Sequence, residues 1–264
     1  MKPYLNIGCG LRYHDDWTNV DFYAAAPEVR SHNLLRGIPY PDASFDAVYH
    51  SHVLEHFSKP DGEKLLRECH RVLRPGGILR VVVPDLEQIA RNYVAALDRA
   101  AAGESGAHAD HEWMVIELCD QMVRTESGGE MVKYLRRPEL NNEAFVYGRH
   151  GYESRGIREN YLHHRDAYDR VDQGWKGRLV SALSGFPTVQ RYLLGRFRLR
   201  GEIHQWMYDR VSLTSLCEKI GFRDCTVQTA RTSRIPEWEH YQSLDVENDE
   251  VRKPDSLFFE ATKA

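Results

Sequence analysis

The sequence predicts an α/β protein built around a largely parallel sheet. Segments typical of strands and helices alternate from the N-terminus to residue 83. Residues 4–21 combine a short apolar strand, a glycine turn and a second strand that ends in a carboxylate. Residues 78–83 form an apolar run interrupted only by Arg80, which is typical of a strand covered on both faces. Together these three observations indicate parallel strands joined by crossover connections.

The next elements follow from local signals. Residues 45–50 are rich in apolar and aromatic side chains and follow a Pro-Asp-Ala-Ser turn, which predicts a strand. Helix start signals at Ser58, Pro60 and Asp61 precede apolar residues at three- and four-residue spacing up to Leu73. The Arg-Pro-Gly-Gly sequence at 74–77 is expected to end this helix, and Pro84 is expected to close the following strand.

The C-terminal part supplies one more helix and two more strands. Ser212 or Thr214 is expected to cap a helix that Gly221 ends. Residues 222–230 and 256–262 have the alternation or aromatic content of strands, and a long polar stretch separates them. The chain therefore contains enough strands to extend the sheet beyond its N-terminal half.

The glycine turn after the first strand predicts a nucleoside site. Gly8 and Gly10 let the backbone turn sharply and approach a ligand closely, and Asp21 stands where a carboxylate can accept hydrogen bonds from ribose hydroxyls. Position 13 is tyrosine instead of the third glycine of a dinucleotide motif, and no Gly-Lys-Ser/Thr sequence follows. The ten residues between Gly10 and Asp21 are fewer than a crossover usually needs, so the first helix must be very short or replaced by a loop over residues 11–17.

Composition limits the functional class. The 264 residues suffice for one α/β domain with an insertion, and the net charge of −4 gives no general attraction to nucleic acid or anionic membrane. Five cysteines stand without metal-ligand spacing, so no metal site is expected and reduced thiols in the cytoplasm are favoured. No apolar run approaches the roughly 18 residues that a membrane span needs.

Five motifs carry a family resemblance. In order and spacing, the chain resembles the class I S-adenosylmethionine-dependent methyltransferases, in particular the small-molecule and glycan-type enzymes of the type 11 group, at Leu5–Gly10, Asp21, Ile38–Asp46, Ser51–His56 and Leu73–Gly77. Residues 201–209 and 213–222 are similar to the last part of the same fold. The resemblance implies a Rossmann-like, doubly wound sheet of seven strands with the last one antiparallel, and S-adenosyl-L-methionine as cofactor. Residues 1–85 and 201–264 would form this core, and the mainly helical residues 86–200 would form a lid that recognises the substrate.

The resemblance also implies which residues hold the cofactor. The glycine turn would contact its amino-acid end, Asp21 its ribose and Asn33 its adenine, where the family usually carries an acidic residue. The residues expected to bind the cofactor are Asn6, Gly8, Cys9, Gly10, Asp21, Phe22, Asn33, Leu34, Ser51 and His52.

Methyl transfer to a hydroxyl group needs a base, and histidine has a suitable pKa. His52 and His204 rank first among the candidates, followed by Tyr208 and Asp209, and His56 is expected to lie behind them. His204 and Tyr208 would share a face if their segment were helical. For each histidine, a structural role as a hydrogen-bonded buried side chain is an equally strong alternative. With an amine acceptor no dedicated base is needed.

Residues 86–200 are expected to set substrate choice. Apolar spacing predicts two amphipathic helices, one from Leu86 and one around Trp113, where either Glu117 or Cys119 continues the apolar face. Residues 148–200 contain eleven Arg and Lys against five Asp and Glu. A solvated basic face is one interpretation, and the other is a lid that binds an anionic or sugar-linked acceptor through Arg149, Arg155 and Arg158. The segment 126–137 is compatible with either a homodimer contact or a lid hinge.

Two other functional classes stay open. An RNA methyltransferase would use the basic stretch for electrostatic binding, but the net negative charge and the absence of an Asn/Asp-Pro-Pro-Tyr motif make nucleic acid the weaker hypothesis. A cofactor-binding module without turnover is the second. The favoured function is O-methylation of a sugar or another hydroxylated small molecule.

Overall fold

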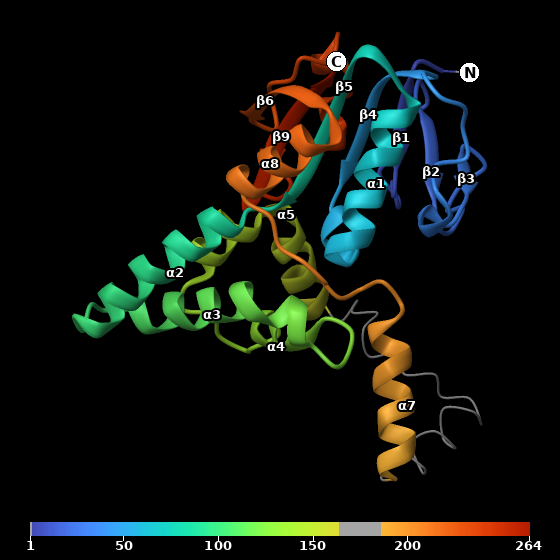
Figure 1. Ribbon diagram of the computed structural model, residues 1–264. Coiled ribbons are helices and arrows are strands. Elements are labelled where there is room, and N and C mark those ends of the chain that lie inside the picture. The colour runs from blue at the N-terminus through green and yellow to red at the C-terminus, as the bar shows by residue number, and fades with distance from the viewer. Residues whose placement is uncertain (1, 164–185) are drawn as a thin grey trace. The chain divides into compact units, whose positions relative to one another are not determined.

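The computed structural model describes residues 2–163 and 186–264 (Figure 1). The chain divides into two compact units, which we call the core unit (residues 1–88 and 205–264) and the insertion unit (residues 89–204). The sequence had placed the two boundaries at 85/86 and 200/201. Residues 164–185 of the basic stretch lie outside the described residues.

The core unit contains a seven-stranded sheet with the order β3-β2-β1-β4-β5-β9-β6. The first five strands are parallel, and β9 pairs antiparallel with both β5 and β6. This mixed sheet, in which the last strand is antiparallel to its two neighbours, confirms the predicted fold class. The strands are β1 (Tyr4–Ile7), β2 (Thr18–Asp21), β3 (Val29–Ser31), β4 (Phe45–Ser51), β5 (Leu73–Pro84), β6 (Phe222–Gln228) and β9 (Ser256–Lys263).

A loop replaces the first crossover helix, as the short spacing predicted. Residues 8–17 contain turns and no helix. The buried amide of Asn6 donates to the carbonyl of Arg12 at 2.9 Å, and that of Asn19 donates to the carbonyls of His14 and Trp17 at 2.9 and 3.0 Å. The side chains of these two strand residues therefore fix the loop conformation, because they donate hydrogen bonds to its backbone carbonyls.

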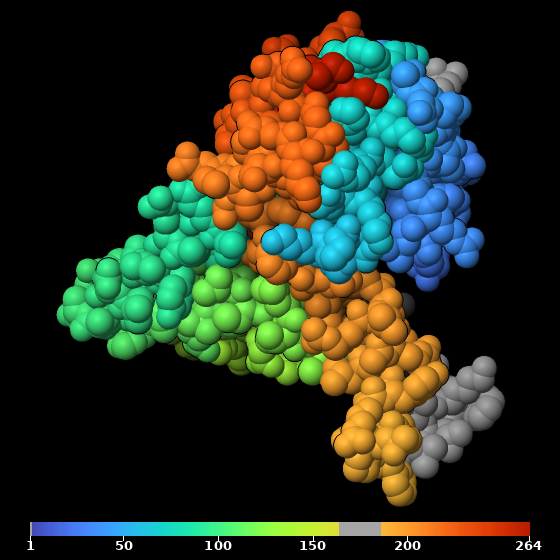
Figure 2. Space-filling view, in the orientation of Figure 1, coloured from blue at the N-terminus to red at the C-terminus, as the bar shows by residue number. Residues whose placement is uncertain are grey.

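Two helices, α1 (Lys59–Val72) and α8 (Arg210–Ile220), cover one face of the sheet and form a continuous layer in Figure 2. Ser58 caps α1 by accepting from the Asp61 N–H, as predicted. The predicted cap of α8 was wrong: Asp209 is the N-cap, and Ser212 is its partner three residues on in a capping box. The left-handed Gly221 ends α8 as expected.

The second correction concerns the start of β5. The Arg-Pro-Gly-Gly sequence was expected to form a helix end, but β5 already begins at Leu73, which pairs with Phe45. The next aligned pair is Ala47 with Ile78, so the register shifts between the two pairs. The two glycines thus lie in an irregular stretch of strand, which a sequence pattern of turn residues cannot distinguish from a loop.

The opposite face of the sheet is covered by Trp17 and by residues 229–251. This segment contains α9 (Trp238–Tyr241), the 3₁₀ helix η3 (Gln242–Leu244) and a hairpin of β7 (Val246–Glu247) and β8 (Glu250–Val251). Arg80, fully buried on β5, pairs with Asp245 at 2.8 Å and with Glu260 at 3.0 Å. Its guanidinium also lies 4.2 Å from the centroid of the Trp238 ring. This buried network fixes the segment on the sheet, because each charge depends on its partner.

The described part of the insertion unit is helical. Its elements are α2 (Leu86–Ala101), which begins in the core unit, α3 (Ala107–Val123), α4 (Gly129–Leu135), α5 (Glu143–Leu162) and α7 (Pro187–Arg198). In α3, Glu117 is buried and Cys119 is exposed, which decides between the two residues that the apolar spacing left open. None of the described helices combines the length and apolar character that a bilayer crossing requires.

Candidate active site

The glycine turn and Asp21 meet at the carboxyl edge of the sheet. Asp21 ends β2, and its carboxylate accepts hydrogen bonds from the N–H of Gly10 at 2.8 Å and of Tyr23 at 3.1 Å. The N–H of Gly8 donates to the carbonyl of Val20 at 2.7 Å. The turn is therefore bound directly to the residue expected to contact the ribose, and the two predicted contacts lie in one hydrogen-bonded unit.

The structure requires glycine at positions 8 and 10 for different reasons. Both have left-handed backbone angles, with φ of +64° at Gly8 and +53° at Gly10. A Cβ on Gly8 would lie 2.3 Å from Cγ2 of Val53, whereas a Cβ on Gly10 would meet nothing within 4 Å. Gly8 thus packs under the loop that follows β4, and Gly10 borders open space where a ligand can approach the backbone.

Other residues predicted to bind the cofactor surround this turn. Asn6 is buried and braces the loop. Burial, reinforced by Asp21, raises the pKa of the Cys9 thiol to about 12, so this thiol stays protonated at neutral pH. Phe22 is half exposed and packs edge-on against Tyr23. At the next edge strand, the side chain of Asn33 caps the 3₁₀ helix η1 (Leu34–Arg36) by accepting from the Leu35 N–H at 3.0 Å.

The best-organised polar group lies just after β4. His52 has a left-handed backbone, with φ of +53°, and its N–H donates to the carbonyl of Val82 at 2.9 Å. Its Nδ1 lies 3.0 Å from the carboxylate of Glu55, and its Nε2 lies 3.0 Å from the hydroxyl of Ser256. Glu55, within the 3₁₀ helix η2 (Leu54–His56), is fully buried, while the His52 side chain keeps 15% exposure. A non-glycine residue in this conformation costs free energy that the surrounding contacts must offset.

A second histidine, His50, lies two residues before His52. His50 on β4 is fully buried, and neither of its ring nitrogens has a hydrogen-bond partner within the described residues. Burial lowers its pKa to about 4, although the carboxylate of Glu55 opposes this shift. His50 is therefore neutral at physiological pH, and it interacts electrostatically with the carboxylate of Glu55.

The remaining catalytic candidates contact other parts of the chain, and their catalytic role stays a prediction. Residues 202–207 are irregular, so His204 and Tyr208 do not share a helical face. His204 belongs to the insertion unit, where its N–H donates to the carbonyl of Gln121 at 3.0 Å. Tyr208 is buried in the core cluster, and burial, then Glu55 and Cys217, raises its pKa to about 12. Asp209 accepts from two backbone N–H groups at the start of α8. The carbonyl of His56 accepts from Gln205 at 2.7 Å.

Two of the three arginines proposed for anion binding are occupied inside the insertion unit. The buried Arg149 forms an ion pair with Glu117. The guanidinium of Arg158, also buried, donates to the carbonyls of Leu135 and Pro138 at 2.9 and 3.1 Å and to that of Arg137. Arg155 lies 5.3 Å above the ring of Tyr147. These contacts favour a structural role for the first two, and an anion-binding role for the set stays a prediction.

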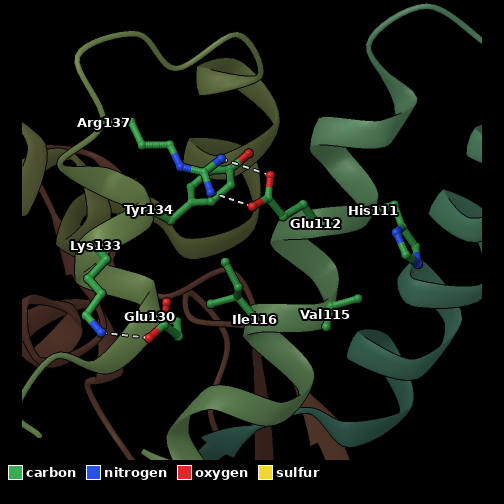
Figure 3. A pocket seen from close by; sticks show the side chains of 8 residues that line it. All are labelled: His111, Glu112, Val115, Ile116, Glu130, Lys133, Tyr134 and Arg137. Carbon is green, nitrogen blue, oxygen red and sulfur yellow. Dashed lines mark hydrogen bonds and ion pairs between the residues drawn. The ribbon is translucent and has the colours of Figure 1, made fainter.

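The insertion unit also contains a cavity of about 350 Å³ between α3 and α4 (Figure 3). An ion pair between Glu112 and Arg137 crosses one side of it, and the guanidinium of Arg137 lies 4.1 Å above the ring of Tyr134. Lys133 pairs with Glu130 at 2.8 Å. These four charges therefore compensate one another in two ion pairs, and His111 is a further titratable side chain in the lining.

Sequence reasoning missed three features of the site. Ser256 was recognised as the start of a strand, but only the antiparallel register, which sets it opposite Pro84, brings its hydroxyl to His52. Glu55 was included only as part of the Ser51–His56 motif, whereas its carboxylate lies 3.0 Å from Nδ1 of His52. His50 was read as part of a strand. Its signal was a polar residue in an otherwise apolar run.

Comparison with known proteins agrees with this geometry. Residues 12–81 match the family Methyltransf_11, described as a methyltransferase domain. This match covers the Asp21 strand, the His52 loop and helix α1. The sheet has the expected seven strands with the last one antiparallel. Residues 12–81 of the chain are thus similar to a methyltransferase domain. The residues of the glycine turn fit S-adenosylmethionine, the cofactor that the resemblance implies, because Gly10 leaves open space beside the Asp21 carboxylate.

Curated relatives match parts of this chain. A protein of Mycolicibacterium smegmatis described as a probable S-adenosylmethionine-dependent methyltransferase is 42% identical over 101 residues, covering 32% of the chain and 38% of the relative. The 27-O-demethylrifamycin SV methyltransferase of Amycolatopsis mediterranei is 32% identical over 139 residues, covering 49% of the chain and 45% of the relative. The chain thus spans less than half the length of these relatives. A methyltransferase structure from Thermotoga maritima aligns with a TM-score of 0.40 and 13% identity, over 99% of this chain and 82% of the other.

Proposed function

We propose that this protein transfers the methyl group of S-adenosylmethionine to a hydroxyl group of a small molecule, with His52 as general base. The observation that carries the proposal is the position of the His52 imidazole between a buried carboxylate and a hydroxyl group. It lies directly after β4, and open α/β sheets bind ligands beyond the carboxyl ends of their strands. The half-exposed glycine turn and Asp21 lie at the same edge.

The neighbours of the two ring nitrogens indicate which nitrogen of His52 can accept a proton. The carboxylate of Glu55 can only accept a hydrogen bond when ionised, so Nδ1 carries the proton and Nε2 keeps its lone pair. With this tautomer, the hydroxyl of Ser256, which lies 3.0 Å from Nε2, is the donor of their hydrogen bond. We infer that the acceptor hydroxyl takes this place, and that Glu55 stabilises the imidazolium that forms.

The reaction then needs only one proton transfer and one displacement. Nε2 of His52 removes the proton of the acceptor hydroxyl, and the oxygen forms a bond to the methyl carbon. The cofactor supplies an electrophilic methyl group, and the carbon–sulfur bond breaks with its electron pair going to sulfur. The protein contributes alignment of the acceptor and a base, which are typical sources of rate enhancement.

The acceptor class is inferred from two observations. A histidine oriented by a carboxylate is suited to a hydroxyl group, which must lose a proton, and is not needed for a neutral amine. One relative is named for methylating 27-O-demethylrifamycin SV, an oxygen site on a small molecule. We therefore propose a hydroxylated metabolite, with sugars among the first acceptors to try.

The test combines turnover with cofactor binding. A panel of hydroxylated acceptors is screened for S-adenosylhomocysteine formation, and the active acceptor is used with His52→Asn and Glu55→Gln. His52→Asn should lower kcat by about 10²- to 10⁴-fold at neutral pH, with the affinity for S-adenosylhomocysteine unchanged. Glu55→Gln should lower kcat more than it changes KM, because it disturbs the tautomer and not the binding surface.

Two control variants distinguish the loss of the catalytic base from an effect that the replacement of any histidine would have. His56→Asn removes the neighbouring candidate, and His108→Asn removes an exposed histidine of the insertion unit. Both should retain most of the activity. Full turnover by His52→Asn would reject the base, and the same loss in His56→Asn would move the role to that residue. Binding of S-adenosylmethionine with no turnover of any acceptor would favour a module without catalysis.

A further inference from the structure

We propose that His14, Asp16 and His240 form a binding site for a divalent transition-metal ion, with zinc as the best fit. All three residues belong to the core unit. They are neighbours in sequence of Trp17, Trp238 and Tyr241, which pack on the face of the sheet opposite α1 and α8. Two imidazoles and one carboxylate are ligands that zinc prefers in proteins. None of the three residues is among those assigned to the cofactor or to the base, so a metal here is a function beyond the proposed methyl transfer.

The geometry brings the ligand atoms together. Nδ1 of His14 lies 3.8 Å and Nε2 of His240 lies 3.2 Å from the same oxygen, Oδ2 of Asp16. One ligand atom from each residue falls within 4.8 Å of the other two. Around a tetrahedral zinc ion with bonds of about 2.0–2.2 Å, ligand atoms lie about 3.3 Å apart. Small rotations of the exposed Asp16 and His240 side chains therefore suffice to close the site around an ion.

The neighbouring rings hold the two imidazoles in place. The ring centroids of His14 and His240 are 5.1 Å apart, and each lies 5.0 Å from the ring of Tyr241 in an edge-on arrangement. Nδ1 of His14 also accepts a hydrogen bond from the Asp16 N–H at 3.2 Å. A metal bound through Nδ1 replaces this bond, and a metal bound through Nε2 keeps it. The side chain of His240 is 60% exposed, so burial does not account for its position beside Asp16.

The metal would join two distant parts of the chain. His14 and Asp16 stand in the loop that replaces the first crossover helix, and His240 lies in α9. The same two regions are already linked by an ion pair between Arg12 and Glu247. Because this loop continues directly from Gly10, a metal bridge would restrict the backbone that leads into the glycine turn.

The experiment uses the full chain without an affinity tag. Zn²⁺ binding is measured by competition with a chromophoric chelator, and Co²⁺ is used as a spectroscopic probe. Zn²⁺ should bind with a Kd of about 1 µM or tighter, and Asp16→Asn and His240→Gln should each weaken it at least about tenfold. Intense visible Co²⁺ bands without a thiolate charge-transfer band would indicate tetrahedral nitrogen and oxygen ligands. Zinc at about 100 times Kd should raise the Tm by about 5–10 °C.

The controls address folding and other metal ligands. Both variants replace a ligand by a polar side chain of similar size at an exposed position, and circular dichroism checks that they fold. His108→Asn should leave Zn²⁺ affinity unchanged. A wild-type Kd far weaker than about 1 µM would overturn the proposal. So would Zn²⁺ binding that survives both ligand variants, or a thiolate band, since the exposed Cys119 would then be a ligand.

Discussion

Alanine substitutions at the two glycines of the turn should have clearly different costs. Both residues have positive φ, and an alanine in this region costs about 1–2 kcal/mol. At Gly10 this strain is the whole cost, because a new Cβ meets nothing within 4 Å. At Gly8 the new Cβ would lie 2.3 Å from Cγ2 of Val53, so a buried neighbour must move. Forcing extra volume into a packed region adds about 1–3 kcal/mol, which gives about 2–5 kcal/mol for Gly8→Ala.

A double-mutant cycle isolates the steric part. Val53→Ala removes both γ carbons, including the one at 2.3 Å, and leaves only its Cβ at 3.3 Å from the new methyl group. In the Val53→Ala background, Gly8→Ala should therefore cost only about the 1–2 kcal/mol of backbone strain. Gly10→Ala should cost the same in both backgrounds, because it has no contact with Val53.

The assay is equilibrium urea unfolding of the wild type and the five variants, with the m-values compared to check that the transition is unchanged. Equal costs for Gly8→Ala and Gly10→Ala would refute the reasoning. An unchanged cost of Gly8→Ala after truncation of Val53 would also refute it, because the loss would then come from the backbone alone.

Two further outcomes can be measured on the same protein. Asp21→Ala should weaken S-adenosylhomocysteine binding by about 1–3 kcal/mol in isothermal titration, and an unchanged Kd would move the ribose contact to another residue. Burial lowers the pKa of His50 from 6.5 to about 4, so between these values the unfolded chain binds a proton that the folded chain does not. Stability should therefore fall as pH falls through this window, by up to about 1.4 kcal/mol per pH unit from this residue. His50→Gln should flatten that slope in urea unfolding, and an identical slope would contradict the assignment.

The sequence predicted the parts of the fold that depend on local patterns. The strand–turn–strand start, the loop in place of the first helix and the helix that Ser58 caps all follow from spacing and residue type. The cap of α8 was wrong because Asp209, Ser212 and Thr214 are all good cap residues. Only the backbone conformation at Asp209 decides among them.

The site was harder to predict, because its contacts join distant segments. His52 and Glu55 are three residues apart and were both noticed, yet no local pattern places Ser256 beside them. That contact depends on the register of β9 against β5. Likewise, the spacing of His204 and Tyr208 had meaning only for a helix, and the segment is irregular. Charge patterns showed where arginines gather but not that buried Glu117 already pairs with Arg149.

The position of β9 has a consequence for the order in which the protein folds. β9 lies between β5 and β6, and it is the last strand of the sheet to leave the ribosome. Within the described residues, β6 pairs with no other strand of the sheet. Until β9 emerges during synthesis, β5 and β6 therefore each have an edge without a hydrogen-bonded neighbour. The insertion unit, in contrast, is one continuous stretch of sequence that emerges before β9. The core unit closes only when sequence-distant strands meet, which makes its completion a comparatively slow step.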